Sequence, residues 1–151
     1  MIRIKPHHFL DIIKLYGKGI EIFVPDKAYD HDFYSVANEI INDHQVQIKL
    51  TIEEDDICRP CKYIGKDGIC KDNINHIDGV SSKDEWNKII DKRIISYSRS
   101  IGNDIYSAYE YCEKLYSIRE HIFDIWQEET DSAKVNRFDA FCFGAKKYLK
   151  I

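Results

Sequence analysis

The sequence has no long apolar run and no excess of basic residues. Its 151 residues include 22 lysines and arginines against 26 aspartates and glutamates, which gives a net charge of −4. Binding to nucleic acid depends on neutralising phosphates and would require the opposite balance. No stretch approaches the roughly 20 apolar residues of a membrane-spanning helix. Arg3, Lys5 and Asp11 interrupt the region where a signal peptide would be apolar. These absences predict a cytoplasmic protein with no membrane or nucleic-acid partner.

Several catalytic signatures are also absent. The chain contains no G-x-x-x-x-G-K-[ST], H-E-x-x-H, G-x-S-x-G or G-x-G-x-x-G pattern, so phosphate-loop, zinc-protease, hydrolase and dinucleotide-enzyme functions have no support. Gly17 and Gly19 flank a lysine and could bind an anion through backbone N–H groups, but a glycine turn that ends a helix is the simpler interpretation. The five cysteines are an odd number, which argues against a disulfide framework in a reducing compartment.

Hydrophobic periodicity predicts a single α+β domain, mostly α, over residues 1–151. Residues 1–80 are expected to form a metal-holding part with short strands and two helices, and residues 81–151 a part with three helices. The expected strands are at residues 2–4, 20–24 and 46–52, where apolar residues alternate or cluster.

Residues typical of helix N-termini predict where the five expected helices begin. Pro6 suits a first helical turn, and Asp30 is a candidate N-cap for the second helix. Ser82 with Glu85 predicts a capping box for a helix to about residue 101, ended by Gly102 and Asn103. The last two helices are expected from Asp104 to Trp126 and from about Asp131 to Leu149.

Three of the cysteines form the pattern C-x2-C-x8-C. Cys58, Cys61 and Cys70 lie at the start of a loop of more than twenty residues, which also contains Pro60 and Gly68. A loop of this length within a compact domain is usually functional or held by something. Two thiolates separated by two residues can face one centre, and a third can join them after a glycine turn. Soft thiolates at this spacing favour Zn²⁺ or an iron–sulfur cluster.

The residues leave alternatives open. Cys58 and Cys61 could be a dithiol redox pair, although the four preceding carboxylates would raise a thiol pKa, and the three cysteines could be structural. His76 could complete a Cys3His zinc site. Cys142 or Cys112 could supply a fourth thiolate from a distance, but each lies on the apolar stripe of its helix and is expected in the core.

Three short segments carry a resemblance: Lys5-Pro6-His7-His8-Phe9-Leu10-Asp11, then Tyr16-Gly17-Lys18-Gly19, then Asp55-Asp56-Ile57-Cys58 with Cys61 and Cys70. They resemble a small bacterial and archaeal family of unknown function. Its members begin with His-His-Leu-Leu-Cys, continue to a Gly-x-Gly turn and carry Asp-Asp-Ile-Cys. The members of that family are inferred to be iron–sulfur proteins, and no reaction is established for them. The resemblance covers about residues 3–72.

The resemblance implies a [4Fe–4S] cluster held by Cys58, Cys61 and Cys70. Asp11 stands where the family has a cysteine, so Asp11 is the expected fourth ligand and Cys142 the alternative. An iron without a thiolate could bind a small-molecule substrate as a Lewis acid. His8 is three residues before Asp11 on the same helix face and is the candidate catalytic residue, either as a hydrogen-bond donor to a ligand or as an acid/base group. Neighbouring helical positions diverge by about 100°, so only one of the two histidines is expected at the site.

The leading hypothesis is therefore an iron–sulfur protein with a small-molecule substrate or a redox partner. The competing hypothesis is a structural zinc domain that acts as a binding or regulatory module. A buried four-thiolate cluster used only for electron transfer is a third. Whether the protein is an enzyme, and its oligomeric state, are left open by the sequence.

Overall fold

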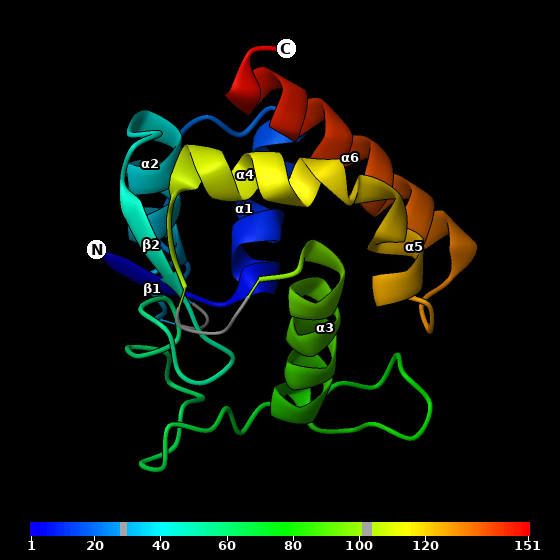
Figure 1. Ribbon diagram of the computed structural model, residues 1–151. Coiled ribbons are helices and arrows are strands. Elements are labelled where there is room, and N and C mark those ends of the chain that lie inside the picture. The colour runs from blue at the N-terminus through cyan, green and yellow to red at the C-terminus, as the bar shows by residue number, and fades with distance from the viewer. Residues whose placement is uncertain (28–29, 101–103) are drawn as a thin grey trace.

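The structure is a computed structural model that describes residues 1–27, 30–100 and 104–151. Within these residues, six α-helices surround and extend away from a small three-stranded sheet (Figure 1). In chain order the elements are β1 (Ile2–Ile4), α1 (Pro6–Gly17), α2 (Phe33–Asn42), β2 (Gln47–Leu50), α3 (Lys83–Ser98), β3 (Ile105–Ser107), α4 (Ala108–Ser117), the 3₁₀ turn η1 (Arg119–His121), α5 (Ile122–Ile125) and α6 (Asp131–Leu149). The predicted α+β class, mostly α, is confirmed.

The sheet brings the N-terminus beside the middle of the chain. Central strand β2 pairs parallel with β1, with Ile4 opposite Leu50, and antiparallel with β3. Helices α1 and α2 form the crossover that two parallel strands need. The chain beyond β2 stays next to β1, since the N–H of Thr51 donates to the carbonyl of Ile4 (3.1 Å) and that of Asp56 to the carbonyl of Arg3 (3.0 Å). Residues 51–56 therefore lie beside the start of α1.

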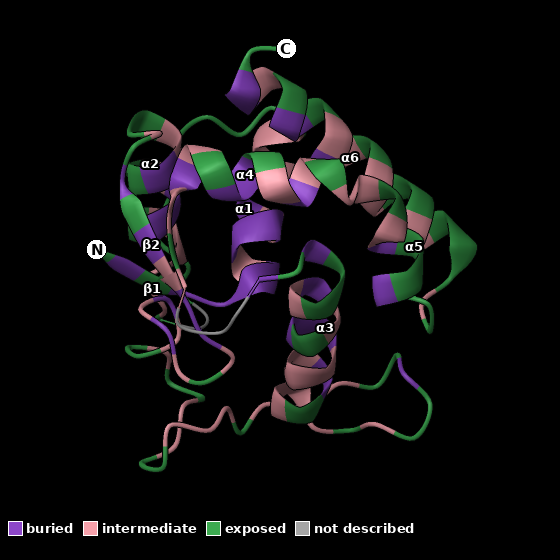
Figure 2. Ribbon diagram, viewed as in Figure 1, coloured by how far each residue is buried: buried purple, intermediate pink, exposed green. Residues whose placement is uncertain are grey.

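Helix α1 forms the centre of the core. Figure 2 shows that its first two thirds are mostly buried, whereas the segment between β2 and α3 is largely intermediate or exposed. It packs against α6 at Gly17 and Gly144, where a Cβ on Gly144 would overlap the carbonyl oxygen of Ile13. Four of its apolar side chains are at most 1% exposed: Phe9, Leu10, Ile12 and Ile13. Its first turn is consequently carried on a fixed element.

The predicted strand at residues 20–24 is wrong. No strand is assigned in this described segment, because the backbone of Phe23 bonds to a side chain instead of to a neighbouring strand. Its N–H donates to Asn38 Oδ1 (2.8 Å) and its carbonyl accepts from Asn38 Nδ2 (3.0 Å). The apolar residues on either side, Ile22 and Val24, are exposed.

The predicted helix from Asp104 to Trp126 is wrong at both ends. Residues 105–107 form β3, and the N-cap is Ser107, whose hydroxyl accepts from the N–H of Glu110 (3.0 Å) while the Glu110 carboxylate accepts from the N–H of Ser107 (2.8 Å). After Ser117 the chain bends into η1 and α5. Because β3 pairs with β2, the sheet draws strands from both parts of the predicted division at residue 80.

The remaining helices differ only at their ends. Helix α2 begins at Phe33 with Asp32, not Asp30, at the N-cap. Helix α3 begins after Ser82, whose side chain accepts from the N–H of Glu85 (3.2 Å), and it ends at Ser98. The predicted break at Gly102 and Asn103 lies outside the described residues. None of the helices in the described ranges is both long and apolar enough to cross a membrane.

Candidate metal centre

A cavity of about 300 Å³ is lined by the first turns of α1, by the loop after β2 and by the beginnings of α2 and α3. The three cysteines predicted to hold a metal all line it, although even Cys58 is 41 residues beyond the end of α1 in sequence. The lining residues that carry potential chemistry include Lys5, His7, His8, Asp11, Cys58, Cys61 and Cys70. The structure thus gathers most of the residues that the sequence singled out.

Short-range turns shape the cysteine loop, residues 58–80. The N–H of Cys61 donates to the carbonyl of Cys58 (2.8 Å), which closes the tight turn expected for C-x2-C. Ile64 and Cys70 form an antiparallel bridge, and Gly68 between them has φ +77, which L side chains rarely adopt. The glycine turn therefore returns Cys70 toward Cys61.

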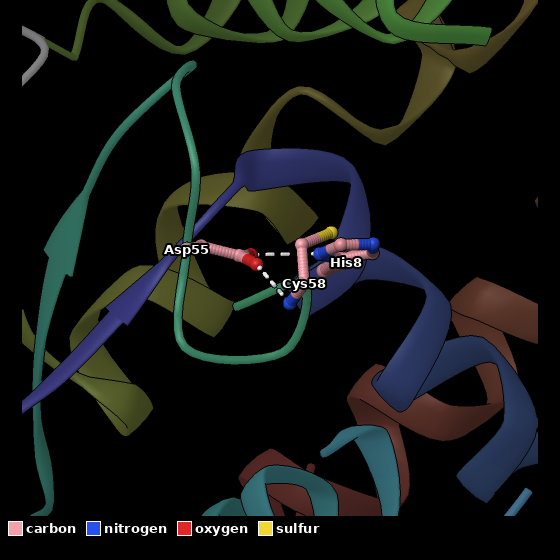
Figure 3. A group of neighbouring side chains, drawn as sticks. All are labelled: His8, Asp55 and Cys58. Carbon is pink, nitrogen blue, oxygen red and sulfur yellow. Dashed lines mark hydrogen bonds and ion pairs between the residues drawn. The ribbon is translucent and has the colours of Figure 1, made fainter. Parts of the chain in front are cut away.

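Asp55 connects the start of α1 to the cysteine loop on the other side of the cavity. It is fully buried, and its Oδ2 accepts from His8 Nδ1 (2.7 Å) and from the N–H of Lys5 (2.9 Å). Its Oδ1 accepts from the N–H of Cys58 (2.9 Å). Figure 3 shows that the other ring nitrogen of His8 and the sulfur of Cys58 lie on the same side, away from Asp55. Because its oxygens are committed to three donors, Asp55 acts as a positioning residue.

The negative charge on Asp55 determines which ring nitrogen of His8 carries the proton. Burial alone would raise the pKa of Asp55, but His8 and the N–H groups of Lys5 and Cys58 hold it well below its usual value. An ionised carboxylate only accepts hydrogen bonds, so Nδ1 of His8 carries the proton and Nε2 keeps a lone pair. Burial also lowers the pKa of His8. A neutral imidazole of this kind is the form that binds metal ions.

The environment of Cys58 disfavours a redox dithiol. Burial and the Asp55 carboxylate raise the pKa of the Cys58 thiol well above its usual value, although Lys5 opposes them. Reactive dithiols need the opposite shift, because the thiolate is the nucleophile. The alternative of a dithiol pair at Cys58 and Cys61 therefore loses support, while a bound metal ion would itself displace the proton.

His7 is held by a second buried carboxylate. Asp91 on α3 is fully buried, and its oxygens lie 2.9 and 3.0 Å from His7 Nδ1. One of them also accepts from the N–H of His7 (2.8 Å). Burial would lower the pKa of His7, but Asp91 raises it overall. The centroids of the two histidine rings are 4.2 Å apart and both rings line the cavity, but each is held by a different carboxylate.

Asp11 lies in the same cavity with cations around it. Its Oδ1 is 3.1 Å from Lys14 Nζ and 3.5 Å from Arg137 Nη1. Burial would raise the pKa of Asp11, but Lys14, His7 and Arg137 hold it below its usual value. As a fourth metal ligand, Asp11 would have to share its charge with two cations.

Three other candidate ligands do not line this cavity. Cys142 is half-buried on α6, where Arg119 is a charged neighbour. Cys112 is fully buried on α4, as expected for a core cysteine. His76 Nε2 lies 3.5 Å from Glu129 and its side chain is half exposed.

Sequence reasoning assigned no role to Lys5, Asp55 or Asp91, although the first two lie in the motif segments. Asp55 is one of four consecutive acidic residues, and nothing local tells which of them is buried. Asp91 offered a weak signal, because it is an acidic residue beside the apolar stripe of α3 at Ile90 and Ile94. Lys5 precedes the paired histidines without any pattern that marks it as buried.

Comparisons with protein-family models, with curated proteins and with solved structures find no match for this chain. The resemblance to iron–sulfur proteins therefore stays a prediction that depends on the motifs alone.

Proposed function

We propose that the cavity holds a [4Fe–4S] cluster, with Cys58, Cys61 and Cys70 as thiolate ligands and Nε2 of His8 as the fourth protein ligand. The observation that carries the proposal is that three cysteines and an imidazole oriented by a carboxylate line one cavity. When bound, such a cluster supplies one-electron transfer, and its potential depends on the ligands, charges and hydrogen bonds around it.

The donor set fits a metal–sulfur group. Three thiolates and one imidazole are the soft and intermediate ligands that iron–sulfur clusters and zinc prefer. Asp55 gives His8 the carboxylate partner that metal-binding histidines usually have on their second nitrogen. His7 and Asp11 line the same cavity and are not needed as ligands, so they leave polar groups for the small-molecule substrate that the sequence suggested.

The three cysteine sulfurs are not already at the spacing of a site for one zinc ion. Zn–S bonds of about 2.3 Å in a tetrahedron place the sulfur atoms about 3.8 Å apart. In the described part of the chain, the one set of three ligand groups with atoms within 4.8 Å of one another is His8, Asp55 and Cys58. At least one pair of the three cysteine sulfurs is therefore farther apart than 4.8 Å. The preference for a cluster is based on the three-cysteine motif and the resemblance, and not on this spacing.

A zinc ion remains the second candidate, because ligand atoms of His8, Asp55 and Cys58 lie within 4.8 Å of one another. In that case the protein would be a structural zinc module. Both candidates require free thiols, so a reducing compartment such as the cytoplasm is part of the proposal.

Anaerobic purification followed by iron, acid-labile sulfide and zinc analysis tests the function. We expect about four irons and four sulfides per chain, with visible absorption that bleaches on reduction. One zinc per chain without iron would favour the second candidate, and the absence of both metals would overturn both.

Variants then test the ligands. We expect Cys61→Ser to lose the bound metal, whereas Cys142→Ser and Cys112→Ser, which remove cysteines outside the cavity, retain it. Loss of the cluster in Cys142→Ser would place the fourth ligand on α6 instead. His8→Ala should change the magnetic-resonance spectrum of the reduced cluster and Asp11→Ala should not; the reverse result would restore Asp11 as the fourth ligand.

A further inference from the structure

Lys5 is a buried cation with its end at the candidate metal centre. It directly precedes α1, and its carbonyl accepts from the N–H groups of His8 (3.1 Å) and Phe9 (3.2 Å). The residue is only 2% exposed and it lines the cavity that the three cysteines share. Its backbone is thus fixed by the helix and by Asp55, and its side chain reaches inward.

The ammonium of Lys5 has an unusual partner. Within the part of the chain that the structure describes, the hydrogen-bond acceptor found for Nζ is the sulfur of Cys58, at 3.9 Å. Burying a charged ammonium is costly unless an opposite charge is near, and a neutral thiol is a weak acceptor. A thiolate would be a strong one. The charges of Asp55, Asp91 and Asp84 also favour the ammonium and offset part of the cost of its burial. The group that its Nζ contacts is nevertheless the sulfur, and this contact is strongest if Cys58 carries negative charge in the functional protein.

We propose that Lys5 is the counter-charge of Cys58 when Cys58 is a metal-bound thiolate, and that it thereby raises the reduction potential of the centre. This inference depends on the proposed function. A positive charge beside a ligand sulfur stabilises the more negative, reduced state, and a hydrogen bond to that sulfur acts in the same direction. Lys5 is a positioning and tuning residue in this role and does not bind the metal.

The test compares two lysines of the same cavity. Lys5→Met removes the charge and the N–H donors while nearly keeping the side-chain volume. Lys83→Met is the matched control, because Lys83 also lines the cavity but has the Asp72 carboxylate 3.5 Å from its Nζ. The midpoint potential of each cluster-loaded protein is measured by titration with dithionite, which supplies one electron per cluster. Circular dichroism verifies folding.

We expect Lys5→Met to shift the equilibrium against reduction about tenfold, which is about 59 mV for a one-electron couple, and Lys83→Met to shift it much less. An unchanged potential in Lys5→Met, or equal shifts in both variants, would overturn the inference. If folded Lys5→Met fails to load, the inference requires Lys5→Arg, which keeps the charge, to load normally. Failure of Lys5→Arg as well would overturn it.

Failure of the proposed function has a different signature. If the wild-type protein contains zinc without iron, the cluster assignment fails, but the pair of Lys5 and Cys58 is tested by chelator competition for Zn²⁺. We then expect weaker zinc binding in Lys5→Met than in Lys83→Met at one fixed pH. Equal zinc affinities in the two variants would overturn the role of Lys5.

Discussion

The two sides of the candidate centre are held in different ways. On the histidine side, His7 and His8 are each fixed by a carboxylate that is fully buried, Asp91 and Asp55. On the other side, the cysteine loop (residues 58–80) is held mainly by its own turns and by two isolated bridges, and its cysteines are only half-buried. Packing and hydrogen bonds organise the first side without any ligand. Under the proposed function, we expect the second side to be completed by the bound group.

The largest effect is expected where the histidine side loses its carboxylate. Asp55→Ala leaves His8 Nδ1 and the N–H groups of Lys5 and Cys58 without their acceptor. We expect metal-free Asp55→Ala to lose about 3 kcal/mol of unfolding free energy, measured by denaturant titration. Cys70→Ser, in the cysteine loop, should lose less than about 1 kcal/mol under the same conditions. Equal losses would remove the distinction between the two sides.

The rate of proteolysis also measures the difference in order between the histidine side and the cysteine loop. Removal of the metal should raise the rate of tryptic cleavage in the cysteine loop, at Lys62, Lys66 and Lys71, by about tenfold, because exposed loops with few contacts open readily. Cleavage after Lys14 on α1 should stay slow in both states. Mass spectrometry of the early fragments identifies the sites. Equal cleavage of the loop with and without metal would show that the loop is ordered by the protein alone.

Low pH should destabilise the folded protein on the histidine side, because it protonates Asp55. The pKa of Asp55 is held below its usual value in the folded protein. Its contribution to stability is therefore present above the unfolded-state pKa near 4 and is lost as the pH falls through the lower, folded-state value. We expect metal-free Asp55→Asn to be less stable than wild type at neutral pH, with a smaller further loss below about pH 4. Parallel stability curves for the two proteins would contradict this.

The smallest effect is expected for an exposed ion pair of the cysteine loop. Lys71 Nζ lies 2.9 Å from Asp67 Oδ2, and both side chains are about half exposed. Surface pairs of this kind contribute little, since water screens them. Lys71→Ala should leave both the metal content and the thermal midpoint unchanged. A loss of metal in this variant would mean that the turn at Gly68 depends on the pair.

The elements with a local signal were predictable. Pro6 placed α1, and the alternation from Val46 to Ile52 placed β2. Strand β3 was missed because three residues are too few to separate a strand from the start of an amphipathic helix, and only pairing with β2 decides between them. The close contact of Gly17 with α6 was likewise invisible, since the sequence offered a helix-ending turn as a sufficient reason for that glycine.

The candidate centre was predictable as far as its ligand types. Cys58, Cys61, Cys70, His8 and Asp11 were all named from the sequence, and all line one cavity. The residues that orient them were not predicted, since Asp55 was noted only as part of a motif and without a role. Asp55 and Asp91 act across 47 and 84 positions of sequence, and such pairings are set by the tertiary fold and leave no spacing pattern in the chain.

The separation of His7 from Asp91 also has a consequence for biosynthesis. A nascent chain that has emerged only as far as the cysteine loop already carries every proposed ligand. It still lacks Asp91, 84 residues after His7, and it lacks β3, the second neighbour of the central strand. Its thiols would meet the cellular milieu before the pocket exists. Under the proposed function, cofactor insertion is thus expected only after α3 and β3 have been synthesised and have joined the fold.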